Sequence, residues 1–145
     1  MKKLFLAVLV AATLGTSAFA ADANKVSYKV KMSFESQFSD AKDITWNVTE
    51  MYTRFTFTLN DEKVEAFYSP SGESIGVSRA VEFKKLPLNA VQKIKKNYSD
   101  YTVKETIEFD RDGDREFFVS LTKGDTKKIL KVSVYGSVSL YTPEK

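Results

Sequence analysis

Apolar and polar residues alternate along two stretches of the chain. Positions 51, 55, 57 and 59 are apolar, and the residues between them are mostly tyrosine, arginine and threonine. The same two-residue period runs from Val103 to Phe109. This period predicts antiparallel strands with one apolar face. We expect helices to cover that face and the opposite face to stay open to solvent or to a partner.

Two helices are predicted, one in each half of the chain. Apolar residues between positions 26 and 38 fit both a strand period and a helical stripe, so the period alone does not decide. In the second half, Pro87 stands where a helix begins, and Val91, Ile94 and Tyr98 follow at helical spacing. By analogy we predict a helix at about 26–38 as well.

The two halves resemble each other at an offset of 60 residues. Ser39-Asp40 matches Ser99-Asp100, and further strands at 64–68 and 128–134 lead to Gly72 and Gly136. We interpret this as two tandem repeats, at about 26–83 and 86–141, each a helix followed by an antiparallel meander. The predicted fold class is α+β, with both repeats forming one sheet that carries its helices on one face.

The first twenty residues have the pattern of a signal peptide. Lys2 and Lys3 precede an apolar stretch from 4 to 14, and Ala18-Phe19-Ala20 fits a cleavage site. We expect cleavage after Ala20, a single mature domain at 21–145, no membrane span after cleavage, and a periplasmic or secreted location.

Composition excludes several kinds of chemistry. The chain has no cysteine and no histidine, which rules out thiol nucleophiles, imidazole bases and zinc sites of the Cys/His type. Its 22 basic and 19 acidic side chains give a net charge of +3, which falls to +1 when Lys2 and Lys3 leave with the signal peptide. A clustered basic face is missing, so we expect no nucleic-acid partner.

The core and turn residues resemble a known family. The segments are Phe34-x-x-x-Phe38-x-Asp40-Ala41-x-x-Ile44-x-Trp46, Val64-x-Ala66-x-Tyr68-x-x-x-Gly72, Leu86-Pro87 and Tyr98-x-x-Tyr101-x-Val103. Over roughly 26–140 the chain resembles the PepSY-like, beta-lactamase-inhibitor-protein-like family of exported bacterial proteins. The resemblance implies a tandem helix-plus-sheet architecture, and it implies similarity to the inhibitor in shape only, with no assigned target. Ser39 replaces a common proline, and the inhibitor's disulfides have no counterpart.

One dense group of carboxylates invites a metal-binding interpretation. Residues 110–116 read Asp-Arg-Asp-Gly-Asp-Arg-Glu, but the glycine is fourth, whereas a calcium loop of the EF-hand type needs it sixth. Asp112-Gly113 between two strands is instead a hairpin signal. We expect no metal and no cofactor. No pair of glutamates stands out for acid–base chemistry, so we expect no enzyme.

The two-residue period also predicts a candidate partner-binding patch. It places six large or charged side chains on the face turned away from the helices: Tyr52, Arg54, Phe67, Phe118, Lys131 and Tyr135. Tyrosine, phenylalanine and arginine on an open sheet are typical of protein recognition. The other interpretation is that these rings brace neighbouring strands, or that a bulge changes their face. The lone Trp46 is expected to pack in the core.

The predicted function is therefore an exported, non-enzymatic module that binds a protein partner through the open sheet face. The alternative is a periplasmic accessory domain that binds a small ligand or a metal through Asp110, Asp112 and Asp114.

Overall fold

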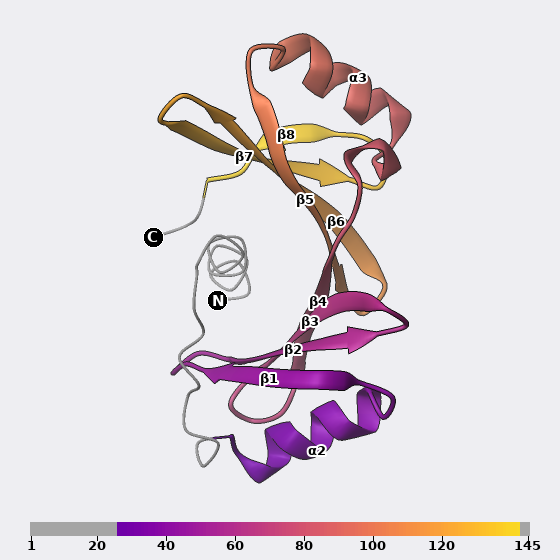
Figure 1. Cartoon of the computed structure of the whole chain (residues 1–145), viewed down its shortest axis with the longest axis vertical. Coiled ribbons are helices and arrows are strands. Elements are labelled where there is room, and N and C mark those ends of the chain that lie inside the picture. The colour runs from indigo at the N-terminus through magenta and orange to yellow at the C-terminus, as the bar shows by residue number, and fades with distance from the viewer. Residues whose placement is uncertain (1–25, 143–145) are drawn as a thin grey trace. The chain divides into compact units, whose positions relative to one another are not determined.

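The described part of the protein has an α+β fold with two α-helices and eight strands. The computed structural model describes residues 26–142, and the signal peptide predicted for residues 1–20 lies outside them. This part of the chain divides between Arg79 and Ala80 into two compact units (Figure 1). Within residues 26–142, no helix has the length and apolar character needed to cross a membrane.

The first unit contains one helix and four strands. Their bounds are α2 (Tyr28–Gln37), β1 (Lys42–Val48), β2 (Thr53–Leu59), β3 (Glu62–Tyr68) and β4 (Ser74–Ala80). The helix predicted at about 26–38 is confirmed. It begins after Ser27, whose Oγ accepts a hydrogen bond from the backbone N–H of Val30 at 3.3 Å. Each strand pairs antiparallel with the next, so β1 is an edge strand.

Aromatic rings hold α2 against the strands of the first unit. Phe34 stacks on Phe55 with ring centres 4.1 Å apart and planes 7° from parallel. It meets Phe57 edge-on at 5.1 Å. Phe55 and Phe57 stand on one face of β2 because they are two residues apart, as the alternation predicts. Val30, one helical turn before Phe34, completes the buried stripe of α2.

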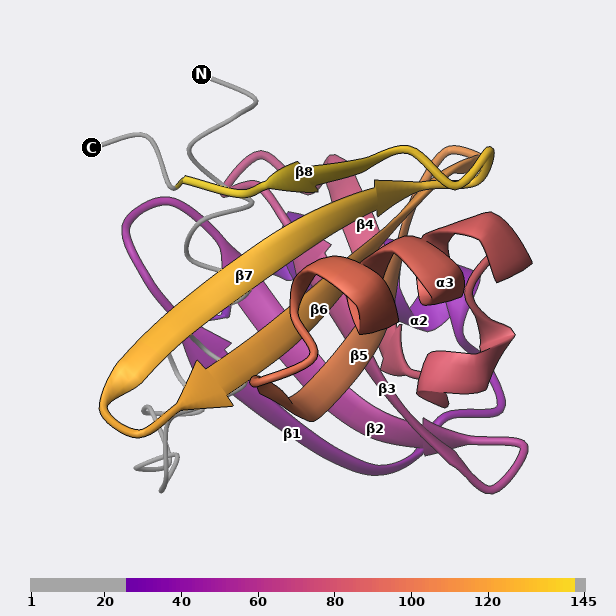
Figure 2. The same cartoon turned by 90° about the horizontal axis from the view of Figure 1, so that it is seen from above.

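The second unit repeats the order of one α-helix and four strands after a short 3-10 helix. Its elements are η2 (Phe83–Lys85), α3 (Leu88–Asn97), β5 (Thr102–Arg111), β6 (Asp114–Lys123), β7 (Thr126–Ser133) and β8 (Val138–Leu140). Pro87 precedes α3 directly, as its position in the sequence predicts. The strands again pair antiparallel in chain order, and α3 lies over them (Figure 2).

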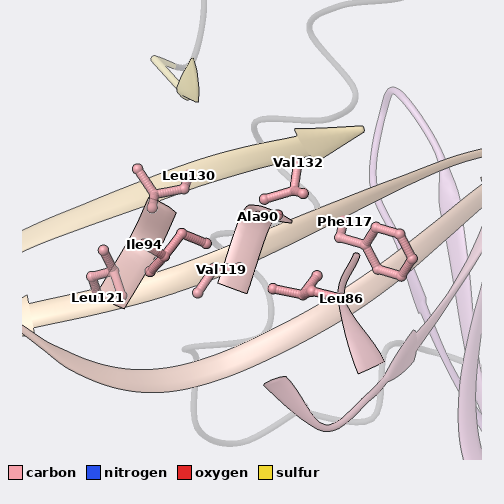
Figure 3. Packing of buried hydrophobic residues seen from close by; sticks show 8 residues of the cluster. All are labelled: Leu86, Ala90, Ile94, Phe117, Val119, Leu121, Leu130 and Val132. Carbon is pink, nitrogen blue, oxygen red and sulfur yellow. The ribbon is translucent and has the colours of Figure 1, made fainter. Parts of the chain in front are cut away.

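The core of the second unit is aliphatic where that of the first is aromatic. Ala90 and Ile94 on α3 face Val119 on β6 and Leu130 on β7 (Figure 3). Ala90 is fully buried. Phe117 is the one aromatic residue among the eight buried members of this cluster.

Strand β5 departs from the expectation of one apolar face covered by a helix. An irregularity between Val103 and Glu105 shifts the register, so that Val103 pairs with Leu121 but Ile107 pairs with Phe118. Cross-strand partners share a face, and Phe118 stands on the face opposite its helix-facing neighbours in β6. Ile107 therefore faces away from α3, and the prediction that Val103 and Ile107 share a helix-covered face is wrong.

Tyr68 joins β3 to the C-terminal end of α2. Its hydroxyl donates a hydrogen bond of 2.6 Å to Oε1 of Gln37. Burial raises the pKa of the Tyr68 phenol from 10.0 to about 12.

We expect Phe34→Ala to lower the free energy of unfolding by about 3–5 kcal/mol, because it removes the ring that stacks on Phe55 and leaves a cavity. Urea denaturation measures the loss. The control is Met32→Ala on the exposed side of the same helix, which should change stability by less than about 0.5 kcal/mol. Equal effects of the two variants would contradict the assigned packing of α2.

Tyr68 should also make stability depend on alkaline pH. Burial raises the pKa of the Tyr68 phenol in the folded state. Its contribution to the free energy of unfolding is therefore complete below pH 10 and is lost as pH rises from 10 to about 12. In Tyr68→Phe this part of the pH dependence should disappear. The variant should also lose about 1 kcal/mol at pH 7, because the hydrogen bond to Gln37 is gone. Urea midpoints between pH 8 and 12 test this, and identical slopes for both proteins would refute it.

Candidate functional site

The acidic segment at 110–116 forms a hairpin turn, as the sequence predicts. Asp112 and Gly113 both have positive φ, 52° and 88°, which is the geometry of a tight two-residue hairpin. One carboxylate oxygen of Asp110 accepts a hydrogen bond of 2.8 Å from the backbone N–H of Gly113. The other lies 3.7 Å from Nε of Arg115. Nowhere in the described range do three or more acidic side chains gather in a way that could hold a metal ion.

The strand period correctly places several of the six predicted patch residues. Arg54 on β2 is the cross-strand partner of Phe67 on β3, so the two share a face. Phe118 on β6 is likewise opposite Lys131 on β7. These four residues are turned away from the helix of their own unit, because their sequence neighbours form its core.

The expectation that this face is open is wrong for three of its aromatic residues. The exposed fraction is 7% for Tyr52, 1% for Phe67 and 2% for Phe118. Arg54 and Lys131 are half-buried. A partner cannot reach a buried ring without displacing whatever covers it. The assignment of all six residues to partner binding stays a prediction.

Neighbouring rings account for part of this burial. Tyr52 and Phe67 have ring centres 5.7 Å apart, and Phe118 meets Tyr141 edge-on at 5.2 Å. Burial also raises the pKa of Tyr52. These contacts are the bracing between neighbouring segments that the sequence left open as an alternative. Lys131 forms an ion pair of 2.6 Å with Glu116.

Tyr135 differs from the other five because 87% of it is exposed. It lies in the turn between β7 and β8, where Ser133 organises the backbone. The Ser133 Oγ accepts hydrogen bonds from the N–H of Tyr135 at 3.3 Å and of Ser137 at 3.1 Å. The Ser133 carbonyl accepts a third from Gly136 at 3.0 Å. A fixed turn therefore presents this tyrosine to solvent.

The first turn of α3 fixes the β7–β8 turn in place. Nδ2 of Asn89 donates a hydrogen bond of 2.9 Å to the carbonyl of Tyr135. Gly136 has a φ of 85°, and a Cβ there would lie 1.9 Å from Oδ1 of Asn89. Leu88 and Val134, next to these residues in the chain, are also exposed apolar side chains. We call Leu88, Val134 and Tyr135 the turn patch.

Sequence reasoning missed Leu88 and Val134. Leu88 lies off the buried stripe of α3, which contains Ala90 and Ile94. An apolar residue outside the stripe of an amphipathic helix is a usable signal of a surface site. The Asn89 contact could not be found this way, because it joins residues 46 positions apart.

A pocket of about 300 Å³ lies in the first unit between α2 and the edge strand β1. Phe34 and Phe55 line it together with Trp46 and Ile44. Trp46 packs against the core cluster of the unit, as predicted, but it remains partly exposed. Lys31 and Glu35, whose charged groups are 3.8 Å apart, also line the pocket.

No protein-family model and no curated protein matches the chain. Several solved structures share its fold. A DUF2874 family protein from Bacteroides uniformis ATCC 8492 aligns with a TM-score of 0.70 and 13% identity over 77% of this chain and 85% of that one. A BLIP-like protein from Bacteroides fragilis NCTC 9343 aligns with a TM-score of 0.67 and 15% identity over 78% and 82%.

A third similar structure comes from Bacteroides eggerthii DSM 20697 and is described as one of its "putative periplasmic proteins". It aligns with a TM-score of 0.68 and 15% identity over 83% of this chain and 86% of that one. Likeness at this level of identity shows the fold alone, and no comparison indicates an enzyme family.

The contact between Asn89 and the β7–β8 turn predicts different costs for two glycine substitutions. Gly124→Ala should cost about 1–2 kcal/mol, because its φ is 56° but nothing lies within 4 Å of the added Cβ. Gly136→Ala should cost about 1 kcal/mol more, because Asn89 must also move and lose its hydrogen bond to Tyr135. Urea unfolding measures both. In an Asn89→Ala background the extra cost should vanish, and its persistence would show that the contact with Asn89 is not its cause.

Proposed function

We propose that the chain is an exported, non-enzymatic binding module that recognises a protein partner. The exposed Tyr135 on its hydrogen-bonded turn is the observation that carries this proposal. Tyrosine supplies a large contact area and a hydroxyl at a low cost in conformational entropy, and it is enriched among the residues that dominate binding energy. Leu88 precedes Asn89 and Val134 precedes Tyr135 in the chain, and both add exposed apolar side chains.

The turn patch is already organised for binding. Backbone hydrogen bonds to Ser133 and the side-chain bond from Asn89 fix the loop before any partner arrives. Association therefore does not have to order this loop, and more of the contact energy remains as affinity.

We expect the sheet-face residues to contribute less to partner binding than Tyr135 does. Arg54 and Lys131 are half-buried and charged, so they could contribute to the rim of an interface next to the buried rings. Phe67 and Phe118 contribute mainly to stability. We therefore expect Tyr135, rather than the sheet face, to make the main contact with the partner.

We also propose that the protein is exported and that its two units are repeats of each other. A similar fold in a protein described as periplasmic supports the location inferred from the signal pattern. The BLIP-like neighbour supports an inhibitor-like shape with an undetermined target. The shared order of one α-helix and four strands supports an origin of the two units by duplication, and we propose that both belong to one mature domain.

A second candidate function is the binding of a small ligand. The pocket between α2 and β1 favours this function. The carboxylates of the 110–116 segment give it no support, because Asp110 is already engaged by Gly113 and Arg115.

We expect Tyr135→Ala to reduce partner binding at least tenfold without changing the urea midpoint, because the side chain is exposed. Mature protein, residues 21–145, would be used to capture partners from the host's periplasmic and secreted extract. The affinity of each identified partner would then be measured with purified proteins.

Tyr28→Ala is the matched control, since Tyr28 is a tyrosine of the first unit that is 76% exposed. Equal loss in both variants, or no specific capture at all, would refute recognition through the turn patch. Phe118→Ala should mainly lower stability, by about 3–5 kcal/mol. If Phe118→Ala instead lost partner binding at full stability, the sheet face would be the main binding surface.

A further inference from the structure

The outer face of α3 is cationic and begins next to the turn patch. From 83 to 99, a stretch that includes α3, the chain has five lysines and no acidic residue. Three of them, Lys93, Lys95 and Lys96, are on the helix itself and are exposed. Within residues 26–142 none of the three forms an ion pair, whereas other basic side chains of the same unit do, such as Lys131. We call these three residues the α3 lysines.

The α3 lysines lie in two rows that start beside the β7–β8 turn. Asn89, which hydrogen-bonds to that turn, is four and seven residues before Lys93 and Lys96, so the three share one side of the helix. Leu88 of the turn patch is likewise seven residues before Lys95. Both rows lie outside the buried stripe of α3. The turn patch and the α3 lysines therefore border each other along the helix.

An interface built on the turn patch has to extend over α3. A standard protein–protein interface buries about 800 Å² on each partner, which corresponds to a roughly circular area about 32 Å across. The three side chains of the turn patch are too few to supply this area. At 10 residues α3 is about 15 Å long, and its first turn contacts the turn that carries Tyr135. An area of this size centred on Tyr135 therefore reaches the α3 lysines.

Helix stability explains only part of this charge pattern. Lys95 and Lys96 are in the last turn of α3, where positive charge interacts favourably with the helix dipole. By the same rule, a carboxylate in the first turn would stabilise the helix, but the first turn has none. A carboxylate there would lie next to the turn patch. Its absence leaves the whole exposed surface of α3 without negative charge.

We propose that the protein partner of the turn patch presents an acidic surface, and that its carboxylates contact the α3 lysines while it buries the ring of Tyr135. This inference rests on the protein recognition proposed above and adds the chemistry of the partner. Complementary charge mainly raises the rate of association, whereas burial of the Tyr135 ring mainly slows dissociation.

An anionic membrane fits this surface less well than an acidic protein does. Basic segments that bind lipid headgroups carry clusters of about four to eight lysine or arginine residues. The helix α3 has three lysines. The exposed ring of Tyr135 on a hydrogen-bonded turn is also the kind of anchor that protein interfaces use.

Selection from a random-peptide library tests the chemistry of the partner without assuming its identity. Peptides displayed on phage would be selected on the mature protein, residues 21–145, and sorted by whether Tyr135→Ala abolishes their binding. We expect the Tyr135-dependent peptides to carry about three more Asp or Glu residues than the unselected library, one for each of the α3 lysines. Raising the salt concentration from about 0.05 M to about 0.5 M should weaken binding of the synthetic peptides at least tenfold.

Two triple variants locate the recognition of acidic groups. Changing all three α3 lysines to glutamine, whose helix propensity is close to that of lysine, should weaken binding of these peptides at least tenfold, mainly through slower association. The matched control makes the same change at three exposed lysines of the first unit, Lys29, Lys42 and Lys63. It removes the same charge and should change the affinity by less than about twofold.

The outcomes separate this inference from the proposed function. Tyr135-dependent peptides without an acidic excess, or with undiminished binding to the α3-lysine variant, would overturn the acidic partner and leave the turn patch in place. Acidic peptides lost in the α3-lysine variant but kept by Tyr135→Ala would show two separate surfaces and refute the role of Tyr135. Absence of any peptide that depends on either surface would contradict both proposals.

Vesicles test the membrane directly. Mature protein would be sedimented with vesicles of equal parts phosphatidylcholine and phosphatidylglycerol at about 0.15 M salt. We expect the protein to stay in the supernatant. Sedimentation of the wild type but not of the α3-lysine variant would overturn the proposal, because it would assign the α3 lysines to an anionic membrane.

Discussion

One helix can cover only one face of the four strands in its unit, and most other features of each unit follow from this constraint. On the covered face, Phe34 of α2 stacks on Phe55, and Ile94 of α3 packs among aliphatic residues of β6 and β7. On the other face, aromatic residues would be costly to leave in water, and their rings contact one another, as Phe118 does with Tyr141. Side chains available to partners are therefore found where neither kind of packing reaches, at the turns and at the edge strand.

The sequence predicts the covered face well and the other face poorly. Alternation in β2 is regular, so counting by two correctly separates Phe55 from Arg54. Counting also identifies Phe67 and Phe118 as turned away from the helices, but it carries no information about what covers them, and both are buried. In β5 the count itself fails, because a single extra residue near Lys104 reverses the faces of all that follows. Counting by two also selects Tyr135, although this residue lies in a turn after β7, whereas the Asn89 contact that fixes the turn is not local in sequence.

Both units use a side chain of the helix to fix a glycine-containing turn. In the first, the hydroxyl of Ser33 donates to the carbonyl of Gly72 at 2.7 Å, and Gly72 has a φ of 90°. In the second, Asn89 donates to the carbonyl next to Gly136. Glycine suits both positions because it adopts positive φ without strain and leaves room for the helix. Each hydrogen bond ties its turn to the helix of the same unit, so a residue on the turn is fixed relative to the core of that unit.

The turn patch and the pocket differ in what each requires of its ligand. Tyr135 is exposed and its backbone is satisfied, so it gains from contact with any partner that buries its ring. Trp46 lines the pocket and is partly exposed, but its N–H group is buried and therefore offers a ligand in the pocket no donor. Burial of a ring rewards size and shape, and a pocket lined mainly by apolar side chains selects its ligand in the same way. The first arrangement therefore suits a large protein surface, and the second suits a small apolar molecule.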